Sequence, residues 1–137
     1  WELALESIIC QLPNILNSDM TINSRYTYKP TTFFSDQLTA FEVWVEEGDP
    51  LELPEQLPCV ILALTQISQR VRALTLLSAY LASGPTAVAY SIRCGVLLYL
   101  WKLLLHTQEA TLLVTLVWSQ LVAVDGAAAC AELVKNQ

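Results

Sequence analysis

The sequence predicts an all-α fold. Apolar residues recur three and four positions apart in most segments of the 137-residue chain, which is the spacing of one face of a helix. No segment shows the alternation of apolar and polar residues that is typical of a half-buried β-strand. Between the apolar segments, glycine and proline provide stops for short helices, as in Ser83-Gly84-Pro85.

Residues 54–95 and 96–137 are predicted to be two copies of one helical unit. A shift of 42 positions superposes similar residues: Gly84 on Gly126, Ala87 on Ala129, Ala89 on Ala131, Ile92 on Val134 and Arg93 on Lys135. Three-helix units that recur about every 40 residues are typical of armadillo and HEAT solenoids. We therefore expect an armadillo/HEAT-type α-solenoid fragment of about two repeats, preceded by two helices and a loop in residues 1–53. A plain helical bundle is the alternative.

Two helices are expected before the first repeat. Residues 1–16 place large apolar side chains on one helical stripe, formed by Trp1, Leu5, Ile8, Ile9 and Leu12. Pro13 should end or kink this helix, because it removes a backbone hydrogen bond and clashes with the preceding turn. Residues 17–32 lack periodicity and are expected to form a surface loop.

The second of these helices should span about residues 35–47. Ser35 suits the N-cap, and Asp36 lies in the first turn, where the helix dipole favours a negative charge. Gly48 should end the helix. Its apolar side chains should pack against the following repeat: Phe34, Leu38, Phe41, Trp44 and Val45.

The helices of the repeats are delimited by proline and glycine. Pro54 suits the first position of the third helix, and Pro58 is tolerated because it lies in or near the first turn. The fourth helix should begin near Ser68 and end at Ser83. The remaining helices are expected at residues 86–93, 96–105, 108–124 and 127–135.

Composition and charge exclude several classes of function. The net charge is −6 and the seven basic residues are scattered, which argues against a nucleic-acid-binding surface. The mean hydropathy is +0.45, but the longest uncharged stretches are shorter than the ~18 to 20 apolar residues of a membrane span. Only 15% of the residues are charged, so we expect another repeat, domain or protein partner to cover part of the surface. We therefore expect no nucleic acid and no membrane span.

The sequence contains no catalytic or metal-binding motif. Cys10, Cys59, Cys94 and Cys130 lack the paired spacing of zinc ligands, and His106 is the single histidine. The cysteines fall within apolar helical patterns and are predicted to be buried, reduced thiols of an intracellular protein. His106 stands at a helix end and suits a C-terminal cap better than a general base. We expect neither an enzyme nor a bound cofactor.

Several segments carry a resemblance to one protein family: WELALESIICQLPNIL, FFSDQLTAFEVWV, PEQLPCVIL, RVRALTLLSAYLASGP, and VWSQLVAVD with ELVKN. They resemble raptor, the regulatory scaffold of the TOR kinase complex. The similarity covers nearly the whole chain and is interrupted at residues 17–32 and 46–53. Two places depart from the family pattern. Thr86 stands where raptor usually has Trp, and residues 97–99 replace an apolar-Pro-Tyr opening of the second repeat.

The resemblance implies a non-catalytic cytoplasmic scaffold. Raptor proteins carry a caspase-like domain, an armadillo-type solenoid and a propeller, and this chain would be the first part of the solenoid of such a protein. The family docks on the HEAT repeats of the TOR kinase and presents substrates that carry a short Phe-x-hydrophobic-acidic-hydrophobic signalling motif. Small GTPases as partners, and recruitment to the lysosomal or vacuolar membrane through partners, are further expectations.

Five residues are candidates for contacts with a partner. Arg70, Arg72 and Arg93 are cations in an acidic chain, and such cations suit a partner's carboxylates. Ordinary solvent-facing helix charge is the alternative. Tyr80 and Trp118 are a second set, because they lie on the helices that line the inner face of armadillo units, and burial in the core is the alternative for them.

A generic armadillo adaptor, for example of the nuclear-import type, is the alternative function. Those carriers grip basic peptides with a Trp and an Asn four residues later on successive inner helices. Trp118 occupies the Trp place, but Val122 stands where Asn is required. Leu76 and Tyr80 hold the equivalent places in the first repeat, so the pattern disfavours an import carrier.

Overall fold

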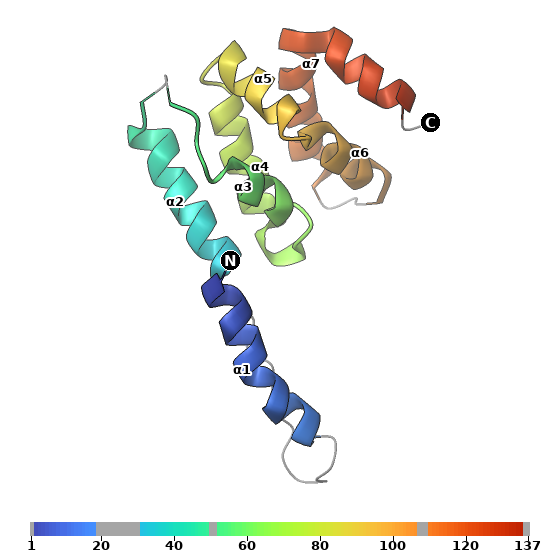
Figure 1. Ribbon diagram of the computed structural model, residues 1–137. Helices are drawn as coiled ribbons and strands as arrows, with labels where there is room; N and C mark the ends of the chain where they lie inside the picture. Colours follow the sequence, from blue (N-terminus) through green and yellow to red (C-terminus); the bar gives the residue numbers. More distant parts are fainter. Residues whose placement is uncertain (1, 19–30, 50–51, 107–109, 136–137) are drawn as a thin grey trace. The chain divides into compact units, whose positions relative to one another are not determined.

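A computed structural model describes residues 2–18, 31–49, 52–106 and 110–135 (Figure 1). Over these ranges the chain is built from helices and contains no strand, so the prediction of an all-α fold is confirmed. The helices are α1 (Glu2–Ser18), α2 (Phe33–Glu47), α3 (Leu57–Ala63), α4 (Ile67–Leu81), α5 (Pro85–Arg93), α6 (Val96–His106) and α7 (Thr111–Lys135).

The chain divides into two compact units, residues 1–36 and 37–137. In the first unit, α1 continues through Pro13 to Ser18, so Pro13 does not end the helix. A proline removes one backbone donor, and the turns on either side of it still form. The predicted apolar stripe of α1 is exposed at Leu5, Ile8, Ile9 and Leu12. Trp1 and most of the predicted loop, residues 19–30, lie outside the described residues.

The start of α2 differs from the prediction. The helix begins at Phe33, and Thr32 rather than Ser35 precedes it. The Asp36 amide donates to the Thr32 carbonyl oxygen at 2.9 Å, and the Thr32 hydroxyl donates to the Asp36 carboxylate at 2.9 Å. The prediction of Ser35 as the N-cap is wrong, because the helix already closes its first hydrogen bond on the Thr32 carbonyl oxygen and Ser35 lies within the first turn.

The end of α2 is where the sequence placed it. Gly48 follows the last helical residue and donates its amide to the Trp44 carbonyl oxygen at 2.7 Å. A Cβ atom at position 48 would collide with that carbonyl oxygen and would lie 2.9 Å from the Trp44 indole. Glycine is therefore required here by close approach to Trp44.

The start of α3 corrects the interpretation of Pro54. The helix begins at Leu57, and Pro58 lies in its first turn as predicted. Pro54 precedes the helix, where its carbonyl oxygen accepts the Leu57 amide at 3.2 Å and closes a turn. Because that turn occupies residues 55–56, Pro54 cannot be the first helical residue.

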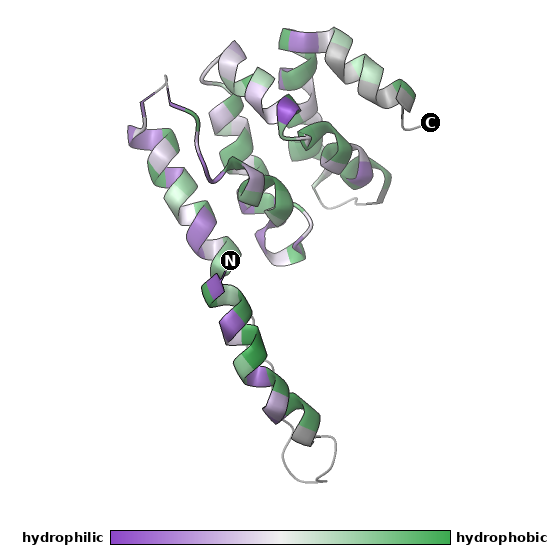
Figure 2. Ribbon diagram, in the orientation of Figure 1, coloured by the Kyte–Doolittle hydropathy of each residue, from purple (hydrophilic) through white to green (hydrophobic). Residues whose placement is uncertain are grey.

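Helix α4 is central to the second unit. It packs on α3, α5 and α7, and α7 also packs on α5 and α6 (Figure 1). The core consists mainly of fully buried aliphatic side chains: Leu57, Val60, Ile61, Leu64, Leu74, Leu77, Val88, Val96, Leu100 and Leu121. Each contributes about 1.5–3 kcal/mol relative to an exposed position. Figure 2 shows α6 as strongly hydrophobic.

Helix α7 is broken at the predicted place. Asp125 has non-helical backbone angles, φ −139° and ψ 70°, which divide the element into residues 111–124 and 126–135. Residues 107–109, where this helix was expected to begin, lie outside the described residues. Each predicted repeat thus contains three helical segments: α3, α4 and α5 in the first, and α6 and the two parts of α7 in the second. The division of the chain at residues 54–95 and 96–137 stays a prediction.

Within the described residues, no single helix combines the length and hydropathy of a bilayer span. Helices α5 and α6 meet that test only when they are joined across a 78° bend.

The cysteines depart from the prediction. Cys10 and Cys130 are exposed, and Cys59 and Cys94 are half-buried, with all four thiols free. Burial raises the pKa of the Cys59 thiol above its usual range. The expectation of buried thiols is wrong, because a cysteine within an apolar helical pattern can still lie at the edge of the buried stripe. His106 is the last residue of α6.

Candidate partner-binding site

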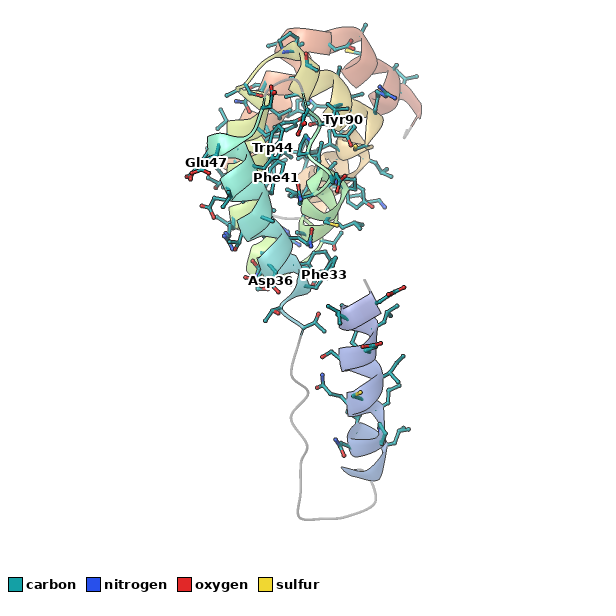
Figure 3. All side chains as sticks on the ribbon, turned by 60° about the vertical axis from the view of Figure 1, so that its left-hand side comes forward. Phe33, Asp36, Phe41, Trp44, Glu47 and Tyr90 are labelled. Carbon is teal, nitrogen blue, oxygen red and sulfur yellow. The ribbon has the colours of Figure 1, made fainter. Side chains whose placement is uncertain are left out.

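An aromatic cluster joins α2 to α4. The Tyr80 ring lies 5.5 Å from the Phe41 ring and 5.6 Å from the Trp44 ring, both edge to face. Phe41 and Trp44 are stacked with 6.4 Å between their centroids. Figure 3 shows Phe41 and Trp44 directed from α2 toward the neighbouring helices, whereas Glu47 points away. Each such aromatic pair contributes about 0.5–1.5 kcal/mol beyond the area that it buries.

A hollow of about 340 Å³ lies beside this cluster. It is formed by the C-terminal end of α2, residues 52–53, the C-terminal end of α4 and the start of α5. Its apolar lining comes from Trp44, Val45, Leu53, Tyr80, Pro85 and Ala87, and Glu52 is its one charged lining residue among those described. Gly48 and Gly84 also line it, and the absence of side chains at these positions helps to keep it open.

The start of α5 lines part of the hollow and lacks a side-chain cap. Gly84 is the N-cap residue, has φ 142°, and supplies no side chain that could cap the helix. Pro85 lacks an amide hydrogen, so the next donors are the amides of Thr86 and Ala87, both of which line the hollow. The site therefore combines apolar walls, one carboxylate and a helix N-terminus.

Tyr80 on α4 is a buried residue that lines the hollow. Burial raises its pKa to about 12, and the neighbouring Tyr90 and Cys94 reinforce the shift. Burial and a hydrogen bond with Cys94 likewise raise the pKa of Tyr90. Tyr80 therefore remains an uncharged phenol at physiological pH.

Arg70 and Arg72, which were predicted to meet a partner's carboxylates, make contacts within the chain. The Arg70 Nε donates to the Leu64 carbonyl oxygen at 2.9 Å, just after the end of α3. The Arg72 Nη2 lies 2.7 Å from the Glu42 carboxylate and donates to Thr39 Oγ1 at 3.0 Å, which joins α4 to α2. Their role in partner binding stays a prediction.

The other three candidate residues lie in different settings. Arg93 is exposed at the end of α5, Trp118 is half-buried on α7, and Tyr80 is buried on α4. Of the five predicted contact residues, Tyr80 is the one that lines the hollow. The sequence analysis did not identify Glu52 and Thr86 as site residues. The signal that could have indicated them is the pair of helix-ending glycines, Gly48 and Gly84, which lie next in the chain to the aromatic cluster.

A second interhelical contact follows the predicted repeat offset. The Ser78 hydroxyl on α4 donates to Gln120 Oε1 on α7 at 3.1 Å, and the Gln120 Nε2 donates to the Ser78 carbonyl oxygen at 3.4 Å. These residues are 42 positions apart, the same offset that superposes the two predicted repeats. Helix α4 and the first part of α7, which the predicted repeats would make equivalent, thus lie side by side.

The chain matches proteins of known identity over most of its length. It is 39% identical over 127 residues to the Target of rapamycin complex 1 subunit mip1 of Schizosaccharomyces pombe, which covers 91% of this chain and 10% of that protein. The Regulatory-associated protein of TOR 1 of Arabidopsis thaliana is 36% identical, with 91% of this chain and 9% of that protein covered. The crystal structure of Chaetomium thermophilum Raptor superposes with a TM-score of 0.74 and 37% identity, over 85% of this chain and 11% of that chain.

The chain is a raptor homologue. The predicted resemblance to raptor is confirmed, and so is the armadillo/HEAT-type α-solenoid fold. The chain spans about a tenth of the length of the raptor proteins that it matches. No protein-family profile matches it.

Proposed function

We propose that this raptor homologue is part of a non-catalytic scaffold that binds the TOR kinase in growth and nutrient signalling. The supporting observation is 39% identity over 91% of the chain to a protein named as a subunit of Target of rapamycin complex 1. A scaffold acts by offering surfaces, and a helical solenoid offers an extended one.

Exposed apolar side chains support a role in association. Leu112 and Leu116 on the first part of α7 are exposed, and so is Val134 near its end. Apolar residues that remain exposed on adjacent turns of one helix are typical of surfaces that another helix or protein covers. Docking on the HEAT repeats of the TOR kinase would cover such a surface, and Arg93 is the exposed cation of the predicted contact set.

Three finer assignments belong to the same proposal. The scaffold helps to present substrates that carry a short TOR-signalling motif, and small GTPases are further partners. It resides in the cytoplasm and reaches the lysosomal or vacuolar membrane through those partners. Fractionation of host cells, with and without the GTPases, tests the location.

Recovery of the kinase from the host tests the central proposal. The protein is tagged in its natural host, and the co-purifying TOR kinase is quantified for the unmodified protein, for Arg93→Glu, and for Lys102→Glu on α6 as a matched exposed charge reversal. We expect Arg93→Glu to lower recovery about tenfold and Lys102→Glu to leave it unchanged. Absence of the kinase from the unmodified sample would remove the scaffold proposal. Equal recovery from all three samples would remove Arg93 alone.

A further inference from the structure

The hollow beside Trp44 and Tyr80 has the size of a side-chain pocket. Its volume, about 340 Å³, is at the small end of the range for ligand sites. This volume can accommodate one or two bulky apolar side chains of a peptide, whereas a large cofactor would need a larger cavity. Trp44 is half-buried, so part of its indole remains accessible from the hollow.

The charge around the hollow is negative. Glu52 is the one charged residue among the described lining, and it is exposed. None of the described lining residues is basic. An occupant with a cationic side chain would therefore gain attraction here, whereas an acidic one would be repelled.

Trp44 and Glu52 together suit a guanidinium or ammonium group. A carboxylate can pair with the cation, and the face of an indole attracts it electrostatically. At the start of α5, the amide of the exposed Thr86, which no side chain caps, can donate to a carbonyl oxygen of a peptide backbone. The hollow thus offers an extended peptide three kinds of contact: apolar walls, a carboxylate for a cation and a backbone donor.

We propose that this hollow binds a short segment of a partner protein in which a bulky apolar residue adjoins Arg or Lys. The apolar side chain enters the hollow, and the cation pairs with Glu52 against the face of Trp44. The inference stands on the geometry of α2, α4 and α5 and does not depend on binding of the TOR kinase, so either proposal can fail while the other holds.

A peptide array tests the chemistry of the occupant. The full-length protein is applied to Gly/Ser peptides that carry Leu, Ile, Met, Phe or Trp next to Arg, Lys, Glu or Asp, and binding is then quantified by fluorescence anisotropy. We expect peptides with a basic neighbour to bind at least about tenfold more tightly than their acidic counterparts. Equal binding, or preference for the acidic peptides, would overturn the proposal.

Variants locate the binding to the hollow. Glu52→Lys should abolish the preference for basic peptides, whereas Glu55→Lys, an exposed acidic residue outside the lining, should keep it. Thr86→Trp places an indole at the hollow and should weaken all peptide binding, with an unchanged circular dichroism spectrum as evidence of folding. Equal effects of Glu52→Lys and Glu55→Lys would show only a general charge effect and would contradict the site. Self-association lost in Thr86→Trp would identify a second copy of the chain as the occupant instead.

Discussion

Helices α1 and α2 carry similar apolar stripes, but the stripe of α2 is buried and that of α1 is exposed. In α2, Leu38 and Phe41 are fully buried within the second unit. In α1, four stripe residues are between 36% and 59% exposed: Leu5, Ile8, Ile9 and Leu12. The comparison shows that periodicity identifies the face that a helix will bury, but not whether a partner surface is present.

Specific side-chain contacts account for the burial of α2. Its stripe meets Tyr80 through Phe41 and Trp44, and its polar edge meets Arg72 through Glu42. These ring contacts and this ion pair all join α2 to α4. Removal of these contacts one at a time measures what each contributes to the stability of the fold.

The largest effect is expected from truncation of the stripe itself. Phe41→Ala should lower the free energy of unfolding by about 3–5 kcal/mol, because it leaves a cavity beside Tyr80. Ile9→Ala at the equivalent stripe of α1 should change it by no more than about 0.5 kcal/mol, since that side chain is already exposed. Urea denaturation of both variants measures the difference, and similar losses would contradict the comparison.

The next effect concerns the end of α2. Gly48→Ala should destabilise the protein by about 1–3 kcal/mol, because the new Cβ must displace the Trp44 carbonyl oxygen and indole. Gly126→Ala is the matched control, since its Cβ would meet only Val122 Cγ1 at 3.9 Å, and it should be neutral or slightly stabilising. A Gly48→Ala variant as stable as Gly126→Ala would show that Trp44 moves freely.

Local spacing accounts for the part of the fold that the sequence could predict. The limits of α4, α5 and α6, and the break near residue 125, follow from periodicity and from glycine and proline, which act within one or two turns. The errors at Ser35 and Pro54 have a different cause. At the start of α2, the first hydrogen bond closes on the Thr32 carbonyl oxygen, three residues before Ser35. Before α3, a turn at residues 55–56 closes on the Pro54 carbonyl oxygen, so the helix begins later than predicted.

The candidate site was less predictable, because it depends on contacts between distant segments. Arg72 was predicted to face a partner, yet its partner within the chain, Glu42, lies 30 positions earlier. Trp44 was predicted as core and is half-buried at the edge of a hollow that residues 52–53 and the start of α5 complete. The glycine stops Gly48 and Gly84 mark the two segments, but only the packing of α2 against α4 and α5 brings Glu52 and Thr86 to the same hollow.

Alkaline pH probes the α4 side of the contact through Tyr80. The pKa of Tyr80 is raised to about 12 in the folded protein, against about 10 for an unfolded tyrosine. Below about pH 10, the neutral phenol therefore makes its full contribution to stability. As the pH rises through about 12 this contribution is lost, and the equilibrium constant for unfolding increases by at most about tenfold per pH unit. Tyr80→Phe should keep the stability at neutral pH and reduce its loss between pH 10 and 12. An unchanged alkaline profile in Tyr80→Phe would assign the loss to other groups.

The smallest effect is expected from the ion pair. Arg72 and Glu42 have side chains that are 36% and 45% exposed, and pairs at such positions contribute about 0–1 kcal/mol. Arg72→Ala and Glu42→Ala should therefore each cost little, and a double-mutant cycle should give a coupling of about 0.5 kcal/mol that weakens at high salt. The charge-swapped pair, Arg72→Glu with Glu42→Arg, should restore most of the coupling. A coupling above about 2 kcal/mol would mean that the ion pair, rather than the aromatic cluster, holds α2 on α4 and so distinguishes it from α1.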